Sequence, residues 1–243
     1  MNNARRPYGL LAVAVILLGM GAALLLYPRW TAWQYSRQVT EQKTRFDDEI
    51  EASARDADDP LERLYRDLQN RNQTLYETSQ ADLRDPFSYE EPGISLAEYG
   101  LQDDIIGFVQ IPALDLELPI VLGANEEHLK QGAAHLTQTS YPIGGENTNC
   151  VLAAHRGYYK APMLREVERL QIGDTVYVQN FRETLTYTVD ELRIIDPSDV
   201  EALLIQPGRD LLTLVTCHPL GGNSQRYVVY CVRSSPEEDN ATE

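Results

Sequence analysis

Cys217 and Arg226 are the residues whose types and spacing first suggest chemistry. The apolar run LLTLVTC ends at Cys217, the turn HPLGGNSQ follows, and RYVVYCV begins at Arg226. In an antiparallel hairpin the last residue of one strand lies beside the first residue of the next, so this thiol and guanidinium should meet at one edge of a sheet. A nearby cation favours the nucleophilic thiolate, and its N–H groups stabilise a carbonyl oxygen that becomes negative.

Nucleophilic chemistry also needs a group that moves protons, and the sequence holds four histidines. His155 closes the apolar stretch CVLAAHRG before a polar turn, and strand ends followed by loops commonly present functional side chains. His218 follows Cys217 directly and should point to the opposite face of the strand. His128 lies in an acidic turn and is expected to be solvated, while His135 is ambiguous. The residue types predict a Cys–His–Arg site; the alternative is a buried structural cysteine with a surface histidine and arginine.

The composition argues against several other classes of function. With 21 Lys+Arg against 37 Asp+Glu, the net charge is −16, which excludes nucleic acid as an expected partner. No CxxC, HxxxH or HExxH spacing predicts a metal site, and no glycine-rich phosphate loop predicts a nucleotide cofactor. Three cysteines are too few for a disulfide scaffold, and whether Cys150 and Cys231 pair stays open at this point.

The N-terminal segment predicts a membrane anchor. Between Arg6 and Arg29 the chain carries no charge and is almost entirely apolar, long enough to cross a bilayer. The apolar run exceeds that of a cleavable signal peptide and lacks a small-x-small cleavage site. We therefore expect an uncleaved transmembrane helix over 8–28, a cytoplasmic N-terminus over 1–7, and the rest of the chain outside the cell. The aromatic residues expected at the outer interface are Trp30, Trp33 and Tyr35.

Two polar helices and a loop should follow the anchor. The segment 29–83 is expected to form a helical stalk, divided where Asp59 caps a helix that Pro60 begins. Docking of these helices onto the following domain is the alternative. Residues 84–100 form a loop by composition, and 235–243 form an acidic tail.

The segment 101–234 has the pattern of a mainly β domain. Short stretches rich in β-branched residues alternate with turns that contain glycine, proline and aspartate, which predicts seven or eight strands in a barrel or a sandwich. The expected strands are 107–112, 116–123, 149–154, 175–179, 184–195, 211–216 and 227–232. Two helix-like pieces are expected between them, at 126–131 and 162–170.

These motifs together resemble the sortase family. TLVTC at 213–217, with Arg226 nine positions after its cysteine, resembles the signature TLxTC…R. CVLAAHRG is similar to the family's histidine-bearing strand end, and GFVQIPALDLELPIVLG to the strand pair that opens its barrel. The resemblance implies an eight-stranded β-barrel with short helices, preceded by a transmembrane helix and two further helices. It also implies a membrane-anchored, extracellular cysteine transpeptidase of Gram-positive bacteria.

The same resemblance implies roles for individual residues. Cys217 would attack the carbonyl after the threonine of an LPxTG-like sorting signal and form a thioacyl enzyme. His155 would protonate the leaving amine and then deprotonate the incoming one. Arg226 would hold the substrate and the developing oxyanion, and Thr216 would help to position the substrate. No cofactor is implied.

Residues 85–87, DPF, resemble the Asp-Pro-aromatic lid of class C sortases, which polymerise pilins. In that class the lid aspartate, here Asp85, pairs with the catalytic arginine, and the aromatic ring, here Phe87, covers the cysteine. The acceptor would then be a pilin lysine. A wall-anchoring sortase that uses a peptidoglycan amine is the alternative within the family. A hydrolytic cysteine protease, and a membrane-tethered adhesion or scaffold domain with an inert Cys217, are alternatives outside it.

Overall fold

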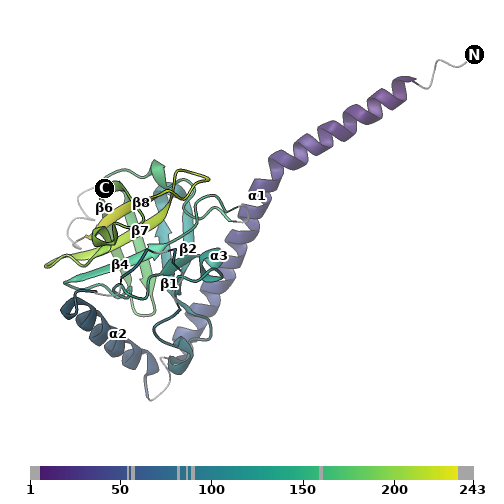
Figure 1. Ribbon diagram of the computed structural model, residues 1–243. Helices are drawn as coiled ribbons and strands as arrows, with labels where there is room; N and C mark the ends of the chain where they lie inside the picture. The colour runs from purple at the N-terminus through teal and green to yellow at the C-terminus, as the bar shows by residue number, and fades with distance from the viewer. Residues whose placement is uncertain are drawn as a thin grey trace, which may run out of the picture.

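The computed structural model describes residues 6–53, 55, 58–80, 83–85, 87–88, 91–158 and 161–234, with side chains from residue 9 onward. The predicted acidic tail lies outside this part of the chain, and so does most of the predicted cytoplasmic N-terminus. One long helix projects from a β-barrel that carries a second helix on its side (Figure 1).

Eight strands close into the barrel, in the order β1-β2-β3-β4-β7-β8-β6-β5. The strands are β1 (Ile105–Ile111), β2 (Leu116–Leu122), β3 (Ala133–His135), β4 (Thr148–Ala153), β5 (Thr175–Asn180), β6 (Thr184–Ile195), β7 (Asp210–His218) and β8 (Gln225–Arg233). The prediction of a mainly β barrel is confirmed, and the sandwich is excluded. The sequence pattern did not identify β3, because three residues are too few to show an alternation of apolar and polar side chains.

Most neighbouring strands are antiparallel, but β4 lies parallel to β7. A parallel pair needs a long crossover connection, and here that crossover contains β5 and β6. The arrangement matters for function because it places the end of β4 beside the end of β7. The barrel is closed by β1 and β5, where Gly107 is opposite Asn180. A Cβ atom at Gly107 would lie 2.2 Å from the backbone oxygen of Gln179, so the close approach requires glycine.

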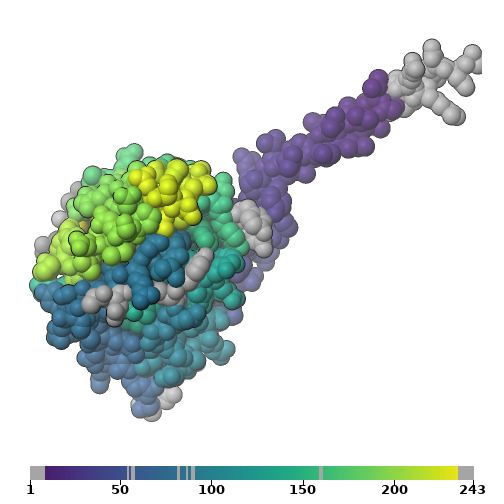
Figure 2. Space-filling model, in the orientation of Figure 1, coloured from purple at the N-terminus to yellow at the C-terminus, as the bar shows by residue number. Residues whose placement is uncertain are grey.

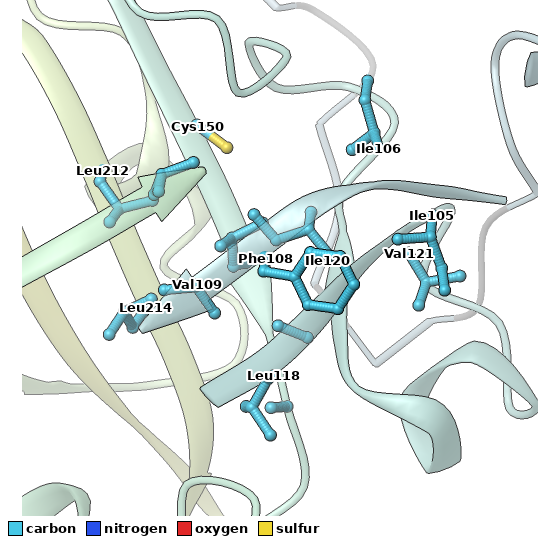
Figure 3. Close-up of a cluster of buried hydrophobic side chains, with 14 of the residues drawn as sticks. Ile105, Ile106, Phe108, Val109, Leu118, Ile120, Val121, Cys150, Leu212 and Leu214 are labelled. Carbon is cyan, nitrogen blue, oxygen red and sulfur yellow. The ribbon is translucent and has the colours of Figure 1, made fainter. Parts of the chain in front are cut away.

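The barrel interior holds the main hydrophobic core. Figure 3 shows part of it, where buried side chains from β1, β2, β4 and β7 meet. Phe108 is buried in this core, and its ring packs edge-on against Phe46 of the long helix, with 5.6 Å between ring centroids. The short connecting helices are η1 (Leu96–Tyr99), η2 (Pro112–Leu114), α3 (His128–Gln131), η3 (Val167–Arg169) and η4 (Val200–Leu203).

Helix α1 (Arg6–Ser53) runs from the apolar N-terminal segment into the domain without a break, although it contains Pro28. Its first part includes a stretch of mean hydropathy 2.6 with no buried side chains, long and apolar enough to cross a membrane. Its second part packs on the barrel through Tyr35, Val39 and Phe46, whose spacing of four and seven residues places them on one helical face. Tyr35 therefore lies against the domain, and not at a membrane interface.

Helix α2 (Pro60–Glu77) begins as predicted, with the Asp59 carboxylate accepting a hydrogen bond from the Glu62 backbone N–H. Its apolar stripe is buried in the same core as the barrel, through Leu61, Leu64 and Leu68. The expected stalk over 29–83 therefore needs correction, because from Tyr35 onward both helices are docked on the domain. The stripe was visible in the sequence, but only the tertiary structure shows the surface that covers it.

Candidate active site

The ends of β7 and β8 bring a thiol and a guanidinium together. Cys217 and Arg226 are directly opposite each other in the antiparallel ladder, as the hairpin pattern predicts. Cys217 is half-buried, whereas Arg226 is almost fully buried. The two side chains therefore share one face at one end of the barrel.

His155 reaches the same end of the barrel through the parallel pairing of β4 with β7. Just beyond β4, the Ala154 backbone N–H donates to the Val215 carbonyl at 3.1 Å, and the Thr216 hydroxyl donates to the Ala154 carbonyl at 2.6 Å. His155 and Cys217 are the residues that follow these bonded neighbours. The fold thus assembles the predicted Cys–His–Arg set from three separate strand ends.

Thr216 links the end of β7 to the chain before His155. Its side chain is fully buried, and its hydroxyl is bonded to the main chain of Ala154. The expectation that Thr216 helps to position the substrate stays a prediction, and the buried hydroxyl shows that any such role would act through the chain that it holds. In this structure Thr216 holds the chain before His155 against the end of β7.

The loop after α2 covers this end of the barrel. Asp85 accepts two hydrogen bonds from Arg226, from Nε at 2.9 Å and from Nη2 at 2.8 Å. The Phe87 ring lies 4.9 Å from the same guanidinium and 6.3 Å from the His155 ring, centroid to centroid. Figure 2 shows the segment after α2, in blue, crossing the barrel beside the yellow-green strands.

The surroundings of Cys217 keep its thiol protonated while the loop is in place. Burial raises the pKa of the Cys217 thiol; the Arg226 charge opposes this shift, and the Asp85 charge adds to it. The loop therefore cancels part of the stabilisation that Arg226 offers to a thiolate.

The surroundings of His155 favour a neutral imidazole. Burial lowers the pKa of His155, the charge of Lys130 lowers it further, and Glu126 acts in the opposite direction. Phe87 and Tyr158 lie beside the ring, the latter with 5.7 Å between centroids. The shifts favour an imidazole that can accept a proton and a thiol that can donate one.

The other three histidines do not share the face that carries Cys217 and Arg226. His135 is buried, stacks on Tyr141 and bonds the Ser140 carbonyl, which makes it a core residue. His128 is not solvated as expected: its side chain is 12% exposed, and its Nδ1 lies 3.0 Å from the Gly123 carbonyl oxygen. His218 points away from Cys217, as the alternation of strand side chains predicts.

Four residues form a polar cluster behind the site, and the sequence pointed to only one of them, His218. They are Arg156, Glu168, His218 and Tyr227, which contact one another on the face opposite Cys217 and Arg226. Three of them directly follow the predicted site residues in the sequence. Because strand side chains alternate between faces, this spacing could have indicated a second cluster behind the site.

The remaining two cysteines are buried and are not disulfide-bonded. Cys150 on β4 and Cys231 on β8 both have free thiols, and burial raises the pKa of each far above its usual range. Only Cys217 combines a free thiol with partial exposure. Among the described residues, no group of three or more His, Cys, Asp or Glu is arranged to hold a metal ion.

Comparison with known proteins identifies the family. Residues 109–234, about half of the chain, match the family model of the sortase domain. The chain is 25% identical to sortase A of Bacillus anthracis over 229 residues, which cover 93% of this chain and 94% of that one. It is 31% identical to sortase D of Bacillus subtilis over 127 residues, which cover 51% of this chain and 61% of the relative. The chain belongs to the sortase family, whose members are cysteine transpeptidases.

Solved structures narrow the likeness to one class. Sortase C1 of pilus island 1 from group B Streptococcus superposes with a TM-score of 0.71 and 31% identity, covering 81% of this chain and 98% of that one. Sortase C of Streptococcus pneumoniae gives a TM-score of 0.67 and 34% identity, covering 79% and 97%. These structural neighbours are class C, or pilin, sortases.

Proposed function

We propose that this protein is a membrane-anchored sortase that cleaves an LPxTG-like sorting signal and transfers it to a pilin lysine, with its own N-terminal loop as a lid. The observation that carries the proposal is the two-pronged hydrogen bond between Asp85 and Arg226, with Phe87 on the guanidinium. The likeness to pilin sortases supports the choice of acceptor. Helix α1 supports a membrane anchor that leaves the catalytic domain outside the cell.

In the proposed reaction, the Cys217 thiol gives its proton to His155 and its sulfur attacks the signal's carbonyl carbon. Arg226 donates hydrogen bonds to the oxygen that becomes negative. His155 then protonates the leaving amine, the peptide bond breaks, and a thioester remains on Cys217. The acceptor amine attacks the thioester, His155 removes its proton, and the new amide leaves with the thiol restored.

The lid must open before this reaction begins. Arg226 uses Nη1 to hold the Asn223 and Gln225 carbonyls, so its orientation is fixed by the chain around it. Its remaining donors, Nε and Nη2, are the ones that Asp85 occupies. Removal of Asp85 frees these donors for an oxyanion and removes a charge that raises the pKa of the Cys217 thiol.

Incubating the full chain in detergent with LPxTG-like peptides tests the proposal. We expect a thioacyl adduct that maps to Cys217 by mass spectrometry and is absent from Cys217→Ala. With the adduct formed, a lysine peptide and a peptidoglycan-type amine compete as acceptors. Preference for the lysine peptide supports pilin polymerisation, preference for the other amine indicates wall anchoring, and free acid alone indicates a hydrolase. No adduct with any sorting-signal peptide would argue for an inert scaffold.

A further inference from the structure

A second polar cluster lies directly behind the proposed active site. Arg156, His218 and Tyr227 each follow one of the proposed site residues in the sequence. His218 on β7 and Tyr227 on β8 face away from those residues because strand side chains alternate, and Arg156, just beyond β4, contacts both of them. The cluster is completed by Glu168, which lies on η3 in the segment after His155. It therefore joins three strand ends and one connecting segment on the face opposite Cys217 and Arg226.

Arg156 is the centre of this cluster. Its Nη1 lies 3.0 Å from His218 Nδ1, and its Nη2 lies 2.8 Å from Glu168 Oε1. Its guanidinium also lies 5.8 Å from the centroid of the Tyr227 ring. Because arginine only donates hydrogen bonds, His218 Nδ1 is the acceptor in its contact with Arg156. Glu168, also 3.4 Å from Nδ1, then acts as the countercharge of Arg156.

Stability alone is a poor explanation for this arrangement. The Arg156 side chain is 3% exposed, and its Nε has no hydrogen-bond partner. A charge buried this deeply is costly, and well-packed apolar residues often replace such pairs without loss of stability. What a multi-donor guanidinium provides, and an apolar side chain does not, is fixed geometry between separate segments.

We propose that Arg156, His218 and Glu168 are positioning residues that hold His155 and Cys217 in register for proton transfer. Arg156 is covalently next to His155, and His218 is covalently next to Cys217. The hydrogen bond between these two neighbours therefore sets the separation of the two chain segments that carry the proton donor and acceptor. This inference rests on the proposed function for its catalytic consequence.

A positioning role makes a specific kinetic prediction. The cluster does not touch the substrate, so its disruption should lower kcat and leave KM for the sorting-signal peptide within about twofold. A misplacement of about 1 Å at the reacting atoms is worth roughly 10- to 100-fold in kcat. General destabilisation would instead lower the active fraction in proportion to the folded fraction.

Two substitutions of His218 separate the hydrogen bond from the ring. His218→Asn keeps an acceptor close to the position of Nδ1, whereas His218→Phe keeps a ring against Tyr227 but has no acceptor. We expect kcat within about threefold of the parent for His218→Asn and about 10- to 100-fold lower for His218→Phe. His128→Phe is the matched control, since it also removes a partly buried imidazole, one whose Nδ1 lies 3.0 Å from the Gly123 carbonyl and whose Nε2 lies 3.6 Å from an Asp104 oxygen, and it should leave kcat unchanged. Thermal unfolding of each variant measures the folded fraction.

A second readout needs no peptide substrate. In an Asp85→Ala, Phe87→Ala background, the alkylation rate of Cys217 against pH reports how far the site favours the thiolate. We expect His218→Phe to move this profile to higher pH by about one unit, and His218→Asn to leave it in place. Peptide mapping assigns the label to Cys217, since the other two thiols are buried.

The outcomes are distinct. If His218→Phe leaves both kcat and the alkylation profile unchanged, the positioning role is wrong. If His218→Asn and His218→Phe lose kcat equally, the imidazole itself takes part in the chemistry, and the proposal is overturned. If the parent protein forms no thioacyl adduct, the proposed function fails, and the alkylation profiles alone decide whether the cluster positions Cys217.

Discussion

The two ends of β7 and β8 use the same kind of polar contact in different ways. At one end, the Asp85 carboxylate binds Arg226 beside Cys217. At the other end, the Asp210 carboxylate accepts hydrogen bonds from the Gly145 N–H at 2.9 Å and the Tyr187 hydroxyl at 3.0 Å. Asp210 belongs to the strand itself, whereas Asp85 belongs to a loop.

This difference in tethering decides which contact opens. Asp210 and Tyr187 both lie on strands of the barrel, so their hydrogen bond persists as long as the barrel does. Asp85 leaves Arg226 if a short loop moves, and Phe87 is the apolar side chain that holds this part of the loop down. The Asp210 contact is therefore a fixed part of the barrel. We propose that the loop with Asp85 and Phe87 opens and closes over Cys217.

The largest effect is expected at Cys217, at the end of β7, and it is best compared with the buried Cys150 on β4. Cys217→Ala should abolish thioacyl formation and leave the fold intact, because the site is partly exposed at a strand end. Cys150→Ala should keep activity and lower the free energy of unfolding by about 1 kcal/mol, because a buried sulfur is lost. Adduct mass and thermal unfolding measure the two effects. An active Cys217→Ala protein would contradict the proposed nucleophile.

Arg226 should be the next most sensitive residue. Arg226→Ala is expected to lower kcat/KM by about 10²- to 10³-fold, through loss of the oxyanion donors. Arg226→Lys should not restore the rate, because a lysine cannot bind the Asn223 and Gln225 carbonyls and still present two aligned N–H groups. Steady-state kinetics check this, and near-complete rescue by lysine would show that charge alone suffices.

His135 is a buried polar residue that is bonded to the Ser140 carbonyl, and its pKa allows a prediction of how stability depends on pH. Burial lowers the pKa of His135 to about 4, against an ordinary 6.5 in the unfolded chain. Between these values the unfolded state binds more protons, so stability is full above about pH 6.5 and is lost as pH falls toward 4. The shift is worth about 3 kcal/mol. Denaturant unfolding against pH measures this loss, which His135→Gln should reduce and His128→Gln should leave in place.

The lid gives the most direct test of the comparison. The contact between Asp85 and Arg226 is worth about 1–3 kcal/mol, and burial of the Phe87 ring about 1–2 kcal/mol. Loss of both should raise the open fraction, so Asp85→Ala with Phe87→Ala is expected to speed alkylation of Cys217 by about 10- to 100-fold. The measurement is the alkylation rate, with thermal unfolding showing that the fold is intact.

Asp210→Ala is the matched variant at the other end of β7. It should lower the free energy of unfolding by about 1–3 kcal/mol, because it leaves the partly buried Tyr187 hydroxyl without its acceptor. It should leave alkylation of Cys217 unchanged under conditions where the protein is folded. If the lid variant alkylates at the parent rate, the loop is an ordinary linker and not a gate.

The sequence by itself determined the positions of most strands and the pairing of Cys217 with Arg226. Alternating β-branched stretches between turn residues predict most of the strands, and a hairpin of known length fixes which residues face each other across it. The opposition of Cys217 and Arg226 follows from that local geometry alone. The cap at Asp59 and Pro60 was predictable for the same reason, since a helix N-terminus is set by adjacent residues.

Only the tertiary structure decided what depends on contacts between distant segments. The parallel pairing of β4 with β7 brings His155 to Cys217, and no local pattern specifies which strand a given strand will join. The docking of α1 and α2 on the barrel corrected the expected stalk, because an apolar stripe does not identify the surface that covers it. The same holds for Arg156 and His218, whose contact joins two segments that are 62 residues apart in the sequence. Interactions between residues near in sequence thus determined most strands and the pairing of Cys217 with Arg226. Closure of the barrel, which joins distant segments, added His155 to them.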